Sequence, residues 1–208
     1  MNLSSPQSAV TGSVLQAAVL SVLAGTTKPL TGRQVARLAA HGSASGVQRV
    51  LDRLVQQGLV DAREAPPAVL YELNREHIAA PIVEALASLR SEFLERLRAA
   101  VAGWSLAPAH ASVFGSAARG DGGLESDIDL FIVRAAEVDA DSPDWRAQLD
   151  ALAAEVERWT GNRAGISEVG EADVMRLAAD RPPVVGDLTR DTLTLAGPSA
   201  DRLFGGER

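Results

Sequence analysis

The sequence of 208 residues predicts an α+β protein in which a long helix joins two domains. Three observations predict this class. Helical apolar periodicity is followed by two short strands in the first third of the chain, a heptad-like apolar stripe follows, and apolar strands then alternate with helices. The predicted boundaries are residues 1–78 for the first domain, 79–103 for the joining helix and 104–208 for the second domain.

The first domain is predicted to contain three helices and a hairpin. Thr31 is a good N-cap for the second helix, and Gly25 and Gly58 stop the first and third helices. This order of elements predicts a winged helix-turn-helix. The predicted helices cover residues 9–24, 31–40 and 45–57, and the predicted strands cover 59–63 and 68–73.

Residues 10–78 resemble the MarR- and ArsR-type winged-helix regulators, among which the pattern Val47-Gln48-Arg49-Val50-Leu51-Asp52-Arg53-Leu54-Val55-Gln56-Gln57-Gly58-Leu59-Val60 is common. The resemblance implies that the third helix enters the major groove of double-stranded DNA, where Gln48 or Arg49 would read base edges and Arg53 would contact phosphate. The outward residues expected to bind DNA are Ser43, Ser45, Gln48, Arg49 and Arg53.

Charge and wing composition leave a second use open for this domain. Residues 1–78 carry a net charge of +2, against −9 for residues 79–208, so the first domain is the part that can approach a polyanion. The wing tip, however, holds Glu64, Pro66 and Pro67 and no basic residue, so we expect modest DNA affinity. The alternative is a winged helix that serves protein contact or dimerisation alone.

A single amphipathic helix is predicted over residues 78–101. Its apolar residues recur at alternating steps of four and three, as in a heptad repeat. The helix could be a spacer packed on its own chain or half of a dimer interface. We favour a homodimer, because winged-helix proteins that read two half-sites need two-fold symmetry. The stripe consists of Ile82, Leu86, Leu89, Phe93 and Leu97.

The second domain is predicted to be a mixed sheet with helices on one face. Its central feature is a small-residue turn, Gly115-Ser116, that opens a short helix eleven positions before two carboxylates on an apolar strand. Asp127 and Asp129 share a face of that strand because side chains alternate with period 2. Two carboxylates so close repel each other unless a cation lies between them, and Mg²⁺ bridging phosphates is the natural partner. The predicted strands cover residues 111–114, 128–133, 164–169 and 193–195.

The segments Gly115-Ser116-Ala117-Ala118-Arg119-Gly120 and Ser126-Asp127-Ile128-Asp129-Leu130 resemble the signature of the DNA polymerase beta-like nucleotidyltransferases, in particular the small bacterial "minimal" group. The resemblance covers residues 108–170. It implies transfer of NMP from an NTP to an acceptor, with two Mg²⁺ or Mn²⁺ ions and release of pyrophosphate. By this resemblance Asp127 and Asp129 would bind both metals, Gly115 and Ser116 would hold the phosphates, Arg119 would neutralise them, and Ser126 would brace the first carboxylate.

Catalytic members of that family usually carry a third carboxylate on a later strand. Here that strand is residues 163–169, and Glu168 is its one carboxylate, so Glu168 is assigned as the third catalytic and metal-binding residue. If Gly165 or Ser167 occupies the position instead, the site would bind nucleotide without efficient turnover.

The function predicted from these resemblances is a DNA-binding transcriptional regulator that carries a metal-dependent nucleotidyltransferase domain. Two alternatives stay open: a regulator that senses nucleotide without catalysis, and a toxin-antitoxin component that modifies protein or RNA. The sequence has no cysteine, which excludes disulfides, thiolate zinc sites and cysteine nucleophiles. It has no signal peptide and no apolar run near the roughly 20 residues of a membrane span, so we expect a cytoplasmic protein without a membrane partner.

Overall fold

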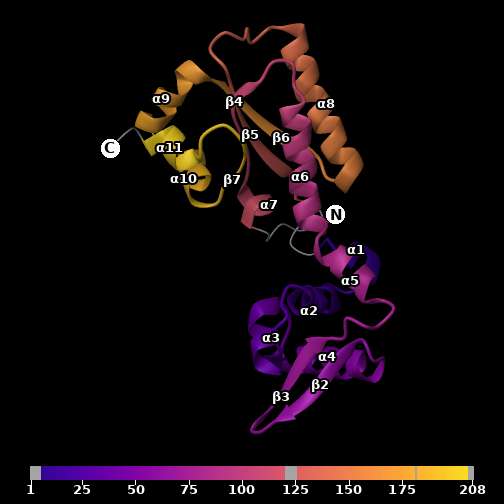
Figure 1. The fold of residues 1–208 in the computed structure, drawn as a ribbon. Helices are drawn as coiled ribbons and strands as arrows, with labels where there is room; N and C mark the ends of the chain where they lie inside the picture. Colours follow the sequence, from indigo (N-terminus) through magenta and orange to yellow (C-terminus); the bar gives the residue numbers. More distant parts are fainter. Residues whose placement is uncertain (1–5, 120–125, 181, 206–208) are drawn as a thin grey trace. The chain divides into compact units, whose positions relative to one another are not determined.

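The computed structural model describes residues 6–119, 126–180 and 182–205. It contains two compact units (Figure 1). The N-terminal unit comprises residues 5–90, and the C-terminal unit is built mainly by residues 91–208. The predicted α+β class is confirmed. In the described part of the chain no helix is long and apolar enough to cross a membrane.

The N-terminal unit is a winged helix-turn-helix. Thr31 caps its third helix in a capping box with Gln34, as the sequence predicts, and Ser43 caps the fourth helix by accepting a hydrogen bond from Gly46 N. The sheet order is β1-β3-β2, with all pairs antiparallel. The elements are α1 (Ser8–Thr11), α2 (Val14–Ala24), β1 (Leu30–Thr31), α3 (Gly32–Ala39), α4 (Ala44–Gln56), β2 (Val60–Ala65), β3 (Ala68–Leu73) and α5 (Ala80–Ala87).

The C-terminal unit is built on a four-stranded mixed sheet of order β6-β5-β4-β7. β5 and β6 run parallel, and the other two pairs are antiparallel. The elements are α6 (Leu89–Ala102), β4 (Pro108–Phe114), α7 (Gly115–Arg119), β5 (Ile128–Arg134), α8 (Pro143–Thr160), β6 (Ala164–Gly170), α9 (Glu171–Asp180), α10 (Pro183–Arg190), β7 (Leu193–Ala196) and α11 (Ala200–Gly205).

Helices cover both faces of this sheet, so the expectation of helices on one face was wrong. Ile128, Leu130 and Ile132 of β5 pack in one core with residues of α6 and α8. Phe131 and Val133 point to the other face and pack with residues of α9, α10 and α11. Figure 1 shows α6 and α8 on one side of the strands and α9 to α11 on the other. Apart from Asp129 and Arg134, the strand is apolar because both of its faces are buried.

The predicted single helix over residues 78–101 is also wrong. It is broken at Ser88 into α5 and α6. Val83 of α5 belongs to the core of the N-terminal unit, whereas Phe93 and Leu97 of α6 belong to the core of the C-terminal unit. Of the stripe residues, Phe93 and Leu97 lie in the core of the C-terminal unit, whereas Ile82 is exposed. The dimer that the stripe suggested stays a prediction.

His110 is fully buried on β4, and both of its ring nitrogens have a partner. Nδ1 donates to the carbonyl oxygen of Pro198 at 2.8 Å, which leaves Nε2 to accept from the hydroxyl of Ser112 at 2.8 Å. Burial lowers the pKa of His110. His110 is therefore a neutral core residue that forms hydrogen bonds with the polar groups of its neighbours.

Candidate functional site

The start of the acidic strand is fixed by the end of α8. Ile128 N donates to Arg163 O at 2.8 Å, which continues the pairing of β5 with β6. Asn162, 5% exposed, donates from Nδ2 to Ser126 O at 2.9 Å, and its own N–H donates to Thr160 Oγ1 at 3.0 Å. These contacts hold the backbone on both sides of Asp127. Sequence reasoning missed Asn162, whose one signal was its place after the helix end at Gly161.

Two glycines flank the carboxylate of Asp129. Asp129 pairs with Phe114, the residue before Gly115, on one side and with Gly165 on the other. A Cβ on Gly115 would lie 2.7 Å from Oδ2 of Asp129, and a Cβ on Gly165 would lie 3.2 Å from Oδ1. Gly115 also has φ +67°, which disfavours any residue with a side chain. The turn therefore lies against the carboxylate because residue 115 is glycine.

The charge around Asp129 is unbalanced. Burial raises the pKa of Asp129, the negative charge of Asp127 raises it further, and Arg119 lowers it. A partly buried carboxylate beside a like charge is electrostatically unfavourable. A divalent cation that takes oxygen ligands would reduce this repulsion. Within the described ranges no group of three or more His, Cys, Asp or Glu side chains could hold a metal ion. Residues 120–125, which connect the two halves of the motif, lie outside those ranges.

The turn, Arg119 and the carboxylates come together as the sequence predicts. Ser116 follows Gly115 in the first turn of α7, and Arg119 ends that helix. Nη1 of Arg119 lies 3.8 Å from Oδ2 of Asp191, just past α10, so the arginine is held between the acidic strand and the helical layer. For Ser126 the structure shows its backbone oxygen bound by Asn162. Its bracing of Asp127 through the side chain stays a prediction.

The five residues predicted to bind DNA differ in how they are held on α4. Ser43, Ser45 and Arg49 are exposed, with the two hydroxyl oxygens 3.0 Å apart and Arg49 Nε 3.4 Å from Ser45 O. Gln48 is engaged within the unit, because its Nε2 donates to Asp52 Oδ1 at 2.7 Å and to the hydroxyl of Tyr71 at 2.9 Å. Arg53 donates to Oε1 of Gln16 on α2.

Family models match both units. Residues 10–68 match the model of the MarR family, and residues 90–169 match the model of the nucleotidyltransferase domain. The chain joins a MarR-family domain to a nucleotidyltransferase domain. The resemblances inferred from the two motifs are thereby confirmed. No curated protein and no solved structure matches the chain.

In the nucleotidyltransferase domain, the structure places Glu168 away from the acidic pair. Glu168 pairs with Ile132, whereas Asp129 pairs with Gly165. Three residues along a strand correspond to about 10 Å and to the opposite face of the sheet. There Oε1 of Glu168 accepts from Nε of Arg134 at 2.8 Å, with the two side chains 21% and 17% exposed. The assignment of Glu168 to the metal site is therefore wrong.

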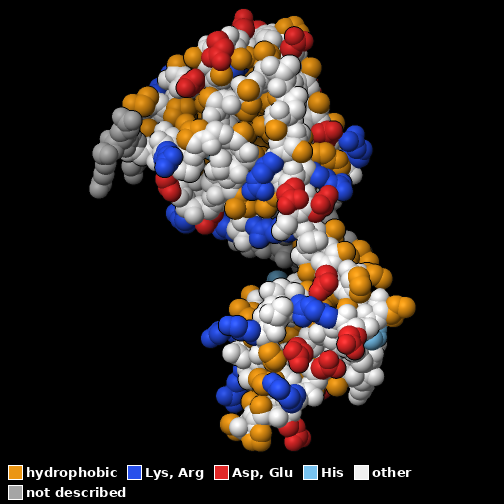
Figure 2. Space-filling view, viewed as in Figure 1, with side chains coloured by type: hydrophobic (Ala, Val, Ile, Leu, Met, Phe, Trp, Pro, Cys, Tyr) orange, Lys and Arg blue, Asp and Glu red, His pale blue; other side chains and the backbone are white. Residues whose placement is uncertain are grey.

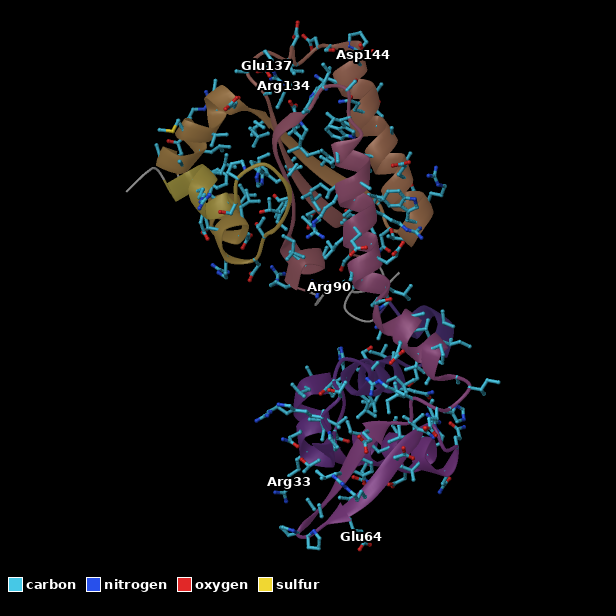
Figure 3. The ribbon with its side chains drawn as sticks, viewed as in Figure 1. Arg33, Glu64, Arg90, Arg134, Glu137 and Asp144 are labelled. Carbon is cyan, nitrogen blue, oxygen red and sulfur yellow. The ribbon has the colours of Figure 1, made fainter. Side chains whose placement is uncertain are left out.

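In the MarR-family domain, a groove lies between the wing and helices α3 and α4. Its volume is about 660 Å³, and its lining includes Arg33, Gln48 and Val69. Figure 3 shows Arg33 of α3 projecting outward near the hairpin, and Glu64 on the hairpin itself. Sequence reasoning missed Arg33 and Arg37, both exposed on α3, because it considered the third predicted helix alone as the DNA-binding element. Basic and acidic side chains are interspersed on the visible face of this unit (Figure 2).

Proposed function

We propose that this protein is a DNA-binding transcriptional regulator whose nucleotidyltransferase domain binds a nucleoside triphosphate together with Mg²⁺ or Mn²⁺. One observation carries the proposal. The carboxylate of Asp129 is enclosed by Gly115 and Gly165, close to the like charge of Asp127 and beside the turn that opens α7. This arrangement supports the approach of a triphosphate and its cation to the protein backbone.

The residues at the site have distinct roles in this proposal. Asp127 and Asp129 would hold the divalent cation, which when bound neutralises the phosphates and fixes the triphosphate tail. Ser116 would donate its hydroxyl to a phosphate oxygen. Gly115 gives the phosphates access to the backbone, and Arg119 supplies a positive charge within range of Asp129.

The DNA-binding part of the proposal rests on the exposed end of α4. Ser43, Ser45 and Arg49 are exposed and would contact a duplex, and Arg33, also exposed, would add a positive charge from α3. Two-fold symmetry would let two copies read two half-sites. Ile78 and Ile82, which are 91% and 62% exposed, lie at α5 and offer apolar area for such a homodimer. No structural observation favours a role in a toxin-antitoxin pair.

Calorimetry on the full chain tests the nucleotide part. Each of ATP, GTP, CTP and UTP is titrated with MgCl₂ or MnCl₂ into wild type and into the double variant Asp127→Asn, Asp129→Asn. At least one NTP should bind wild type, and the double variant should lose that binding because both anionic ligands are gone. Glu137→Gln is the matched control, since Glu137 is exposed and lies at the end of the unit away from α7 (Figures 1 and 3). Equal affinity in wild type and the double variant would contradict the proposal.

A further inference from the structure

β6 offers no carboxylate to the acidic pair. Residues paired across neighbouring strands share a face, so the β6 residues on the face of Asp129 are Gly165, Ser167 and Val169. All residues of β6 are described, and its one carboxylate, Glu168, lies on the other face in contact with Arg134. The position directly beside Asp129 is occupied by glycine.

Transfer of a nucleotide needs more than two carboxylates at such a site. The oxygen of an acceptor hydroxyl must attack the α-phosphorus, the bond from that phosphorus to the bridging oxygen must break, and pyrophosphate must leave with the electron pair. The hydroxyl proton must pass to a base. A pair of divalent cations roughly 3.5–4 Å apart also needs several oxygen ligands, of which the phosphates supply a part and protein carboxylates the rest. Among the described residues, Asp127 and Asp129 supply the two negative charges of this site, and β6 supplies no base.

We infer that the nucleotidyltransferase domain holds its nucleotide with one cation and does not transfer NMP, because glycine occupies the β6 position beside Asp129 and no carboxylate of β6 shares that face. The bound nucleotide is then a ligand of the regulator and not its substrate. This inference rests on the proposed function and specifies how that site works.

Position 165 also allows the inference to be tested by restoring what is missing. A Cβ there lies 3.2 Å from Oδ1 of Asp129, so an aspartate requires that carboxylate to shift by a few tenths of an ångström. Gly165→Asn introduces the same bulk without the charge and is the matched control. Ser167→Asp places a carboxylate on the same face two residues along and is a second variant if Gly165→Asp does not fold.

The first measurement counts bound Mn²⁺ in the full chain by electron paramagnetic resonance. The probe is the α,β-methylene analogue of the NTP that calorimetry identifies. Wild type and Gly165→Asn should hold one Mn²⁺ per nucleotide. Gly165→Asp should hold a second, with an affinity for it about tenfold or more above that of Gly165→Asn. The same samples are assayed with the NTP itself for pyrophosphate release, with and without cell extract.

The outcomes separate this inference from the proposed function. One Mn²⁺ in wild type, with no pyrophosphate above the level of the Asp127→Asn, Asp129→Asn variant, supports the inference. Two Mn²⁺ ions in wild type, or pyrophosphate release that this double variant abolishes, overturns it and leaves nucleotide binding intact. Absence of any metal-dependent nucleotide binding in wild type overturns the proposed function and this inference with it.

Discussion

The two ends of the β5–β6 pair differ in how their charges are compensated. Two carboxylates neighbour each other at one end, and an arginine and a glutamate form an ion pair at the other. At one end Asp129 lies beside Gly165, and its charged neighbour on the chain is Asp127, of the same sign. At the other end Arg134 lies beside Gly170, where a Cβ would be 3.2 Å from Nη2, and the Glu168 carboxylate contacts it at 2.8 Å. A glycine on β6 lies beside a charged side chain at both ends. At the Asp129 end, burial and the like charge of Asp127 outweigh the opposite charge of Arg119.

The difference separates structure from function within one pair of strands. A partly buried ion pair such as Arg134–Glu168 satisfies its own charges and needs no ligand. Two neighbouring carboxylates cost stability in the folded protein and would gain from a cation, which is the basis of the proposed cation site. The predictions below change one end at a time.

The largest effect is expected for Gly115→Ala. The new Cβ would lie 2.7 Å from Asp129 Oδ2 and must displace that carboxylate, so metal-dependent nucleotide affinity should fall about 10- to 100-fold. The positive φ adds about 1–2 kcal/mol of lost stability. Gly161→Ala is the matched control, because Gly161 has φ +73° with nothing within 4 Å of its Cβ position. Calorimetry should show normal nucleotide affinity for the control. A normal affinity for Gly115→Ala would contradict a role of the Asp129 carboxylate in nucleotide binding.

Glu168→Gln should affect stability and leave binding alone. It removes the charge that balances Arg134, and we expect the free energy of unfolding in urea to fall by about 1–3 kcal/mol. Nucleotide affinity should equal that of wild type, because Glu168 lies on the opposite face from Asp129. The exposed control Glu137→Gln should change stability by less than about 0.5 kcal/mol. A fall in nucleotide affinity without loss of stability would indicate that Glu168 takes part in nucleotide binding.

The same contrast between engaged and available groups applies to α4 of the MarR-family domain. Gln48 is bound by Asp52 and Tyr71, whereas Arg49 is exposed. Arg49→Ala should lower the slope of log affinity against log salt by about 1 for short duplex DNA of random sequence. Gln48→Ala should leave that slope unchanged. Fluorescence anisotropy over a salt series measures both, and equal slopes for wild type and Arg49→Ala would exclude a phosphate contact.

Local patterns predicted which residues lie close together at the start of β5. The alternation of side chains on a strand placed Asp127 and Asp129 together, and the Gly115-Ser116 turn was expected beside them. Glu168 was misplaced because the register between β5 and β6 depends on tertiary packing across the intervening α8. A shift of one residue moves a side chain to the other face. No short-range pattern in the sequence carries that information.

The joining helix shows a second limit of sequence patterns. The apolar spacing around Phe93 and Leu97 was real, but periodicity does not say which partner a stripe contacts. Val83 packs into one core and Phe93 into another, with a break between them at Ser88. The role of Asn162 was equally out of reach, since its hydrogen bond to Ser126 joins residues 36 positions apart.

The smallest expected effect is a pH dependence of the stability, caused by Asp129. Burial raises the pKa of Asp129 above its usual 3.8, and Asp127 raises it further. The folded protein then holds this proton more tightly than the unfolded chain, so Asp129 costs stability at neutral pH, and the cost disappears as pH falls through the raised pKa toward 3.8. Without divalent cations, Asp129→Asn should be more stable than wild type at pH 7, and the difference should shrink toward zero near pH 4. Thermal unfolding of both proteins across this range measures the difference. A constant difference would mean that the charge of Asp129 is already balanced in the folded protein.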